Sequence, residues 1–233
     1  MNKKYLLGGI VLLLVLGICL FFFLKPNSKE EEIVYQDVSI TDSAVTSLYN
    51  MVNGCDDVSF LKELYQNETF SNEYILGSAL ILYFQNHSSL SEPVSSSLIA
   101  PYVYTIFGNR TYTDTSVIAS PYSFSYNEEN QTYSMEMIDY EENEAIKRKL
   151  ISAKKTDTEY VLTEKSIVVL YEDSSLLIYD DILHTTLLDT LEGALEDVSD
   201  DLIDNYLDES STYEYHFTFN GENFVFTSFQ KIS

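Results

Sequence analysis

A row of carboxylates recurs at every fourth position in the last third of the chain and could hold a cation. Its members are Glu192, Glu196, Asp200, Asp204 and Asp208. Oxygen ligands suit Ca²⁺, but no EF-hand pattern accompanies them. The row therefore predicts weak Ca²⁺ binding or a surface for a cationic partner, and we expect no other cofactor. Like charges four residues apart destabilise a helix by about 0.2–0.5 kcal/mol per pair. The alternative interpretation is a solvated acidic face that the basic segment 147–165 partly neutralises.

Cys55 is a candidate nucleophile because histidines follow it in the order found in papain-like enzymes. They are His87, His184 and His216. A reactive thiolate needs electropositive surroundings, whereas Asp56 and Asp57 directly follow Cys55. The histidines also lack the His-x-x-x-His spacing of a metal site. We therefore predict an unreactive thiol, no metal held by histidine, and a solvated His216 on the polar face of its strand.

Three short motifs resemble those of penicillin-binding enzymes. Ser59 and Lys62 fit Ser-x-x-Lys, Ser125 and Asn127 fit Ser-x-Asn, and Lys155 begins a Lys-Thr-Asp in place of Lys-Thr-Gly. The third motif lacks its glycine, and the 30 residues between the second and third motifs are too few for that family's intervening helical domain. Two more Ser-x-x-Lys patterns occur in this serine-rich chain. We predict no catalytic serine and no other catalytic residue.

The charge of the chain limits its partners. There are 37 Asp and Glu against 13 Lys and Arg, a formal net charge of −24. Nucleic-acid binding needs a basic surface, so this function is excluded, and anionic lipid headgroups or wall polymers are unfavourable partners for the same reason. Residues 25–233 hold all 37 acids and 11 of the bases, a net charge of −26. The composition favours cations or basic partners.

Residues 5–24 form an uncharged, mostly apolar run. As a helix it would cross a hydrocarbon core of about 30 Å. A cleaved signal peptide has a shorter apolar region and a small-x-small site, which the sequence at 21–25 lacks. We predict a single-pass, uncleaved membrane anchor.

The anchor divides the rest of the chain. Residues 1–4 are predicted to be a cytoplasmic tail, because Lys3 and Lys4 weakly favour the inside. Residues 25–32 read as a polar linker, and residues 33–233 as one acidic extracytoplasmic domain. Residue types with AT-rich codons are far more common than those with GC-rich codons. This bias indicates an AT-rich genome and, together with the anchor, the cell envelope of a low-GC bacterium.

Helical patterns dominate the first half of this domain. We expect a helix capped by Asp42 that ends before Gly54, a short one over 60–65, and a third, capped by Ser71, whose apolar run at 74–84 is too short to span a membrane. A fourth is predicted to begin near 91–93 and to end or bend at Pro101.

Period-2 patterns dominate the second half. Hairpins are predicted over 122–137 and 167–179, and a further helix over 189–207. The last hairpin has Asn-Gly at 220–221, which predicts a two-residue type I′ turn that pairs Phe219 with Glu222. Its aromatic face could be a carbohydrate platform, but a one-sided aromatic sheet is more typical of a core.

These elements predict an α+β fold, in which an N-terminal transmembrane helix precedes a helical half packed on a mostly antiparallel sheet. In element order this is similar to the cone-shaped NTF2-like group. Functionally, we expect an envelope protein without catalysis whose acidic domain binds another envelope protein or a basic peptide. The alternatives are an envelope hydrolase without a recognisable motif and a Ca²⁺-stabilised binding domain.

Overall fold

The computed structural model describes residues 33–87, 92–138 and 143–233. The predicted anchor at 5–24, with the tail before it and the linker after it, lies outside these residues. No helix within the described ranges is long and apolar enough to cross a membrane. Residues 35–233 form one compact unit. This unit is α+β, with its helices in the N-terminal half and antiparallel sheets that come mainly from the C-terminal half.

The three predicted N-terminal helices are confirmed, the first and third with their predicted caps. They are α2 (Ser43–Val52), α3 (Val58–Asn67) and α4 (Asn72–Asn86). The side chains of Asp42, Asp57 and Ser71 accept hydrogen bonds from free backbone N–H groups in the first turns, which is why the helices begin there. α2 buries Val45 and Leu48 on one face, whereas α4 is buried on nearly all sides.

The fourth predicted helix begins later than expected. Val94 and Ser95 form the short strand β2, the 3-10 turn η1 (Ser96–Leu98) follows, and the helix α5 covers Ala100–Phe107. The prediction that Pro101 ends or bends a helix is wrong, because Pro101 lies in the first turn of α5. Proline is tolerated there, since the N–H that it lacks would have no helical partner.

Two antiparallel sheets complete the unit. The larger one has the order β1-β6-β7-β10-β11, and β8 extends it by pairing with β7 and β9. Its strands are β1 (Gln36–Val38), β6 (Glu144–Lys155), β7 (Glu159–Glu172), β8 (Ser175–Tyr179), β9 (Leu187–Glu192), β10 (Ser211–Phe219) and β11 (Phe224–Lys231). The smaller sheet has the order β2-β5-β4-β3, with β3 (Val117–Ala119), β4 (Tyr122–Asn127) and β5 (Thr132–Met137). The β4–β5 and β7–β8 hairpins confirm the two predicted ones.

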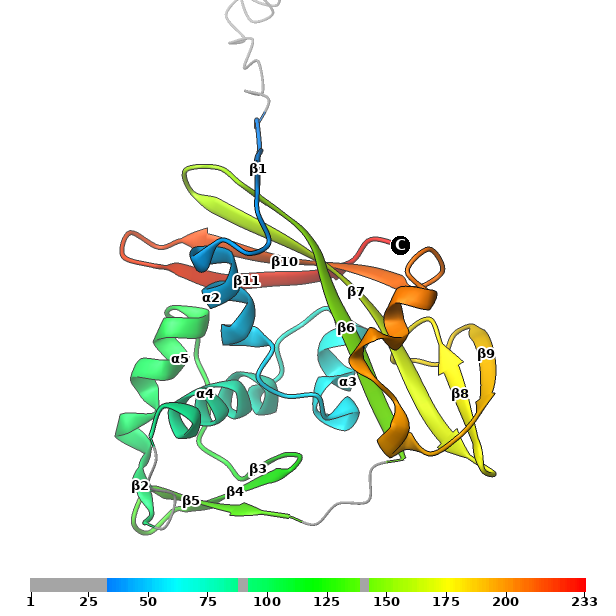
Figure 1. Ribbon diagram of the computed structural model, residues 1–233. Helices are drawn as coiled ribbons and strands as arrows, with labels where there is room; N and C mark the ends of the chain where they lie inside the picture. Colours follow the sequence, from blue (N-terminus) through cyan, green and yellow to red (C-terminus); the bar gives the residue numbers. More distant parts are fainter. Residues whose placement is uncertain (1–32, 88–91, 139–142) are drawn as a thin grey trace, which may run out of the picture. The chain divides into compact units, whose positions relative to one another are not determined.

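The helices lie between the two sheets (Figure 1). α3 and α5 contact β11 of the large sheet, and α3 and α4 contact β3 of the small one. One core cluster joins residues of all three layers, such as Leu80, Phe124 and Phe217. The aromatic face of the last hairpin belongs to this core, with Tyr215 and Phe226 almost fully buried, so the core interpretation of that face holds.

The prediction of a helix over 189–207 is wrong. This segment contains β9 and two 3-10 turns, η2 (Leu195–Asp197) and η3 (Asp200–Asn205). Gly193 interrupts it with φ +154°, a conformation that side chains other than glycine rarely adopt. Asp189, the first residue of the predicted helix, lies on β9 and accepts a hydrogen bond from the Tyr206 hydroxyl at 2.8 Å. Repulsion between carboxylates four residues apart also disfavours a helix here.

The last hairpin has a different register from the predicted one. Phe219 pairs with Phe224 rather than with Glu222, so the loop has four residues instead of two. Asn220 explains the longer loop, because its side-chain oxygen accepts hydrogen bonds from the backbone N–H groups of Glu222 and Asn223, both at 2.9 Å. The register shifts by two residues, so the aromatic side chains stay on the same face.

Candidate functional site

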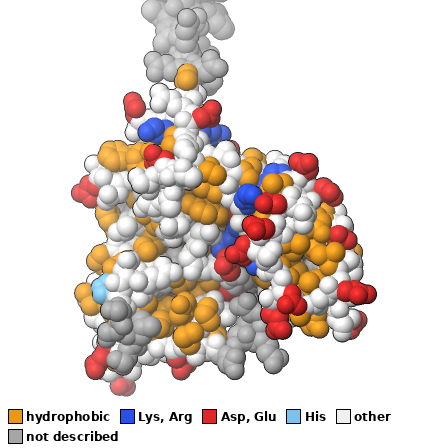
Figure 2. All heavy atoms as spheres, in the orientation of Figure 1, with side chains coloured by type: hydrophobic (Ala, Val, Ile, Leu, Met, Phe, Trp, Pro, Cys, Tyr) orange, Lys and Arg blue, Asp and Glu red, His pale blue; other side chains and the backbone are white. Residues whose placement is uncertain are grey.

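The predicted acidic row lies beside the basic strand β6. Lys147 binds Asp200 at 2.8 Å, and Lys149 forms an ion pair with Asp204. The hydrogen bond from Lys147 lowers the pKa of Asp200. Figure 2 shows acidic side chains gathered over β8, β9 and the segment that follows, with Lys and Arg beside them. Partial neutralisation by the basic strand is therefore what the structure shows for these two members of the row.

The row does not assemble a metal site. Its residues come from the end of β9, from η2, from η3 and from the turn after it. Over the ranges that the structure describes, no group of three or more His, Cys, Asp or Glu side chains is placed to hold a metal ion. Asp200 itself is almost fully exposed, with 96% of its side chain accessible, and exposed pairs of this kind contribute little to stability.

Cys55 is buried in the middle of the α2–α3 connection. Its Sγ lies 3.7 Å from the carbonyl oxygen of Ser120, and burial raises the pKa of the thiol to about 12. Each histidine has its own neighbour elsewhere. His87 stacks on Tyr83 with 4.2 Å between ring centroids, and His184 stacks on Tyr179 at 4.6 Å. The papain-like order of these residues in sequence does not correspond to a cluster in space.

We expect Cys55 to resist thiol reagents in the folded protein. At pH 8 iodoacetamide should leave it unmodified, because the thiolate population is negligible and the side chain is buried. In denaturant the same residue should react fully. Mass spectrometry of the peptide that contains Cys55 provides the measurement, and modification in native buffer at the rate of a free cysteine would contradict the buried placement.

The Ser-x-x-Lys residues are also dispersed. Ser59 lies in the first turn of α3, Ser125 on β4 of the small sheet and Lys155 at the end of β6. The Lys155 ammonium lies over the Tyr160 ring, 5.7 Å from its centroid. The three motifs thus lie on a helix and on two different sheets.

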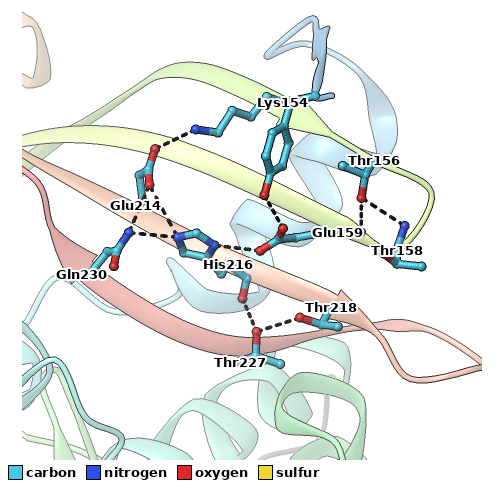
Figure 3. Close-up of polar contacts among 10 residues, drawn as sticks. Lys154, Thr156, Thr158, Glu159, Glu214, His216, Thr218, Thr227 and Gln230 are labelled. Carbon is cyan, nitrogen blue, oxygen red and sulfur yellow. Dashed lines mark hydrogen bonds and ion pairs between the residues drawn. The ribbon is translucent and has the colours of Figure 1, made fainter. Parts of the chain in front are cut away.

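A polar network covers part of the outer face of the large sheet (Figure 3). His216 on β10 lies between two carboxylates, with Nδ1 2.8 Å from Glu159 and Nε2 3.5 Å from Glu214. Gln230 on β11 is 3.2 Å from His216 Nε2, and Lys154 on β6 binds Glu214 at 3.1 Å. The prediction that His216 is solvated is wrong, since only 18% of its side chain is exposed. Charged groups on three adjacent strands pack around it.

Tyr35 joins this network from the N-terminal side of β1. Its hydroxyl donates a hydrogen bond to Glu159, which raises the pKa of Tyr35 to about 12. The Lys154 ammonium lies 5.2 Å from the centre of its ring. β1 pairs with β6 over only three residues, so Tyr35 adds a side-chain contact to a short edge strand.

The network predicts a pH dependence of stability. Burial alone would raise the pKa of Glu159, but hydrogen bonds from Tyr35 and His216 together lower it. A carboxyl whose pKa is lower in the folded state stabilises the fold above its unfolded pKa, near 4.3, and loses this contribution as the pH falls through the folded value.

Glu159→Gln should therefore be less stable than the wild type at pH 7, by about 1 kcal/mol for the loss of charge-assisted hydrogen bonds. The difference should shrink as the pH falls from 5 to 3. Urea unfolding at each pH measures it, and Glu63→Gln, at an exposed position on α3, is the control. A difference that grows toward acid pH would contradict the assignment.

A buried carboxylate, which sequence reasoning missed, lies on the inner face of the same sheet. Glu164 on β7 is fully buried and accepts hydrogen bonds from Tyr49 at 2.5 Å, and from Tyr65 and Tyr215 at 2.9 Å each. Burial raises the pKa of Glu164, against the charge of Arg148 and the three hydroxyl donors. The alternation of side chains along the strand could have predicted its burial, because Glu164 lies two residues after the buried Leu162 and therefore on the same face.

Arg148 extends the buried cluster toward α3. Its side chain is 3% exposed, its Nη2 donates to the carbonyl oxygen of Cys55 at 2.7 Å, and it also contacts Asp56. The cluster of Glu164, Arg148 and the three tyrosines is closely packed between the sheet and α2–α3. It links these layers by hydrogen bonds rather than forming an open site.

A large hollow lies on the helical side of the unit. This α2–α4 groove has a volume of about 630 Å³, within the range of ligand pockets. Its polar lining consists of Ser43, Thr46, Ser47, Asn50, Gln85 and Thr105. Met51 and Leu82 complete it. No carboxylate, imidazole, thiol or amine lines it, so the groove offers hydrogen bonds and apolar contact but no acid or base.

Together, the fold and the groove define an α+β domain with helices between two antiparallel sheets and an uncharged groove at the helical layer. No family model matches the chain, and no curated protein or solved structure matches it either.

Proposed function

We propose that the chain is a single-pass envelope protein, anchored through residues 5–24, whose extracytoplasmic domain binds another protein and catalyses no reaction. The observation that carries the binding part of this proposal is the α2–α4 groove, whose volume suits a ligand and whose lining is uncharged. The apolar run at 5–24 and the excess of acids after it support the anchor and the exported location.

The hydrolase alternative has less support. A general acid or base must lie within hydrogen-bond reach of a substrate, and none of the titratable candidates lines the α2–α4 groove. Cys55 is buried, and His216 is held between Glu159 and Glu214. The acidic row contacts the lysines of β6. A binding domain accounts for the groove without requiring any of these groups to react.

The NTF2-like cone stays a prediction about fold. The helical layer covers one face of the large sheet, which agrees with the element order of that group. The small sheet on the other side of the helices is an additional layer (Figure 1).

Two experiments test the proposal. A cysteine introduced at Ser28→Cys should react with a membrane-impermeant reagent on intact cells, whereas labelling only after lysis would contradict the exported location. Cross-linking and affinity purification of the full-length chain from its native membrane should yield a defined protein partner. A chain cut after residue 34 is the control, and recovery of the same proteins with both chains would contradict a binding function for the domain.

A further inference from the structure

The connection between β9 and β10 forms a strap over the outer face of the large sheet. The strap consists of residues 194–209, in which η2 contacts β7 and η3 contacts β6 (Figure 1). Within the described ranges, its backbone hydrogen bonds join its own residues or the adjoining Ser210, as from the Tyr206 N–H to the carbonyl oxygen of Ile203 at 3.0 Å. The strap can therefore lift without breaking a backbone hydrogen bond of the sheet.

The apolar contact under the strap is separate from the main core. Ile203 is 1% exposed and packs against Ile167 on β7 and Ile178 on β8, and none of the three belongs to the core cluster between the two sheets. The Tyr206 hydroxyl adds a hydrogen bond to Asp189 on β9. Lifting the strap would thus expose one small cluster and leave the helices packed. Segments with few buried contacts open at a lower free energy than the whole domain.

Lysines of β6 and β7 hold the strap on the sheet. Ion pairs join Lys147 and Lys149 to it, and the Lys165 ammonium donates to one of its backbone carbonyl oxygens. Only 16% of the Lys147 side chain is exposed, against 96% of its partner Asp200, so the lysine is covered while the carboxylate faces water. The strap has seven acidic residues and no Lys or Arg. The lysines therefore provide its electrostatic attraction to an otherwise acidic domain.

The two ends of the strap confine a movement to the residues between them. Gly193, just before the strap, has φ +154°, and hinges are commonly small residues at the end of an element. After the strap, the Ser211 N–H donates to the carbonyl oxygen of Asp180 at 3.0 Å, which fixes the start of β10. A lifted strap would therefore leave β9 and β10 in place.

We propose that the strap opens as a unit, independently of the rest of the domain, and that Lys147, Lys149 and Lys165 hold it closed. Opening uncovers these three amines together with Ile167 and Ile178, and so exposes a basic and apolar strip that the closed domain hides. Short 3-10 turns are marginal without packing, so the hydrogen bonds inside the strap break when it lifts. The backbone amides of η3 therefore report the opening, and the inference does not depend on the proposed binding function.

Hydrogen exchange of the full-length chain in detergent micelles, read by mass spectrometry, measures the opening. The peptide that contains η3 should exchange at least tenfold faster than α4, and at least tenfold slower than the same peptide in denaturant. Combining Lys147→Gln with Lys149→Gln should speed exchange of this peptide about tenfold, as expected for the loss of a few weak ion pairs. The exchange of α4 should not change. Lys62→Gln, at an exposed position on α3, is the control for a lost positive charge and should leave both rates within twofold.

A second variant tests whether the strap is a separate unit. Ile203→Asp removes the apolar contact and should leave the strap open. Lys147 should then react with an acylating reagent at least fivefold faster than in the wild type. Circular dichroism and the exchange of α4 should stay as in the wild type, because the main core does not include Ile203. Loss of the whole fold in this variant would contradict a separate unit.

Three results with the other proteins would overturn the proposal. Exchange of η3 as slow as that of α4 would show that the strap opens only when the whole domain unfolds. Exchange of η3 in the wild type at the rate seen in denaturant would show that no closed state exists. Wild-type exchange in the Lys147→Gln, Lys149→Gln protein would show that these lysines do not hold the strap.

Discussion

Replacing Glu164 with alanine should lower the free energy of unfolding by about 3–5 kcal/mol, the cost of breaking a buried polar cluster. The hydroxyls of Tyr49, Tyr65 and Tyr215 would all lose their acceptor. An unsatisfied buried group costs about 1–3 kcal/mol, and the total stays below three such losses because Tyr65 and Tyr215 already lie 3.1 Å apart and can bond to each other.

Urea denaturation followed by far-ultraviolet circular dichroism gives the measurement. Glu63→Ala, at an exposed position on α3, is the control and should change stability by less than about 0.5 kcal/mol. Glu164→Gln keeps an acceptor oxygen of the same reach, so its loss should be smaller than that of alanine. A Glu164→Ala protein within about 1 kcal/mol of the wild type would show that the tyrosines do not depend on this carboxyl group.

Arg148→Met should be the next most damaging change, with an expected loss of about 2–4 kcal/mol. Methionine can follow the path of the aliphatic stem, but it leaves the Cys55 carbonyl oxygen without its donor at 2.7 Å and removes the cation whose charge lowers the pKa of Glu164. Lys62→Met, at an exposed site on α3, is the matched control for the loss of one positive charge.

A double-mutant cycle separates these two effects of Arg148. If its charge stabilises ionised Glu164, Arg148→Met should cost less in a Glu164→Gln background than in the wild type, by about 0.5–2 kcal/mol. Equal costs in both backgrounds would assign the whole role of Arg148 to its bonds with the α2–α3 connection.

Local signals in the sequence predict much of this fold. The caps at Asp42 and Ser71 and the alternation around Phe124 act within a few residues, so the helices and the β4–β5 hairpin form where these patterns indicate. The segment at 189–207 shows where such signals stop. Leu191 and Tyr206 pack on one apolar cluster, as two side chains on one face of a helix would, but they reach it from a strand and from the end of a 3-10 turn. Periodicity alone does not distinguish the two arrangements.

The candidate site was less accessible to sequence reasoning. The contact between the acidic row and the lysines of β6 follows from opposite charges and was anticipated. The position of His216 was not anticipated, because Glu159 and Lys154 come from strands far away in sequence. The α2–α4 groove likewise arises only when α2, α4 and α5 are placed together. Functions that depend on tertiary juxtaposition leave no local motif.

The short pairing of β1 has a mechanical consequence. A pull on the N-terminal end of the domain meets β1 first. This strand is held by three residue pairs with β6, by the contacts of Tyr35 with Glu159 and Lys154, and by the packing of Val38 on the core. Peeling this strand releases residues 35–41, roughly 23 Å of chain, before any load reaches α2 and the core. If the chain is anchored through residues 5–24 as proposed, the domain could lengthen its tether under tension and keep its helices and core folded, which would extend its reach toward a partner at a varying distance.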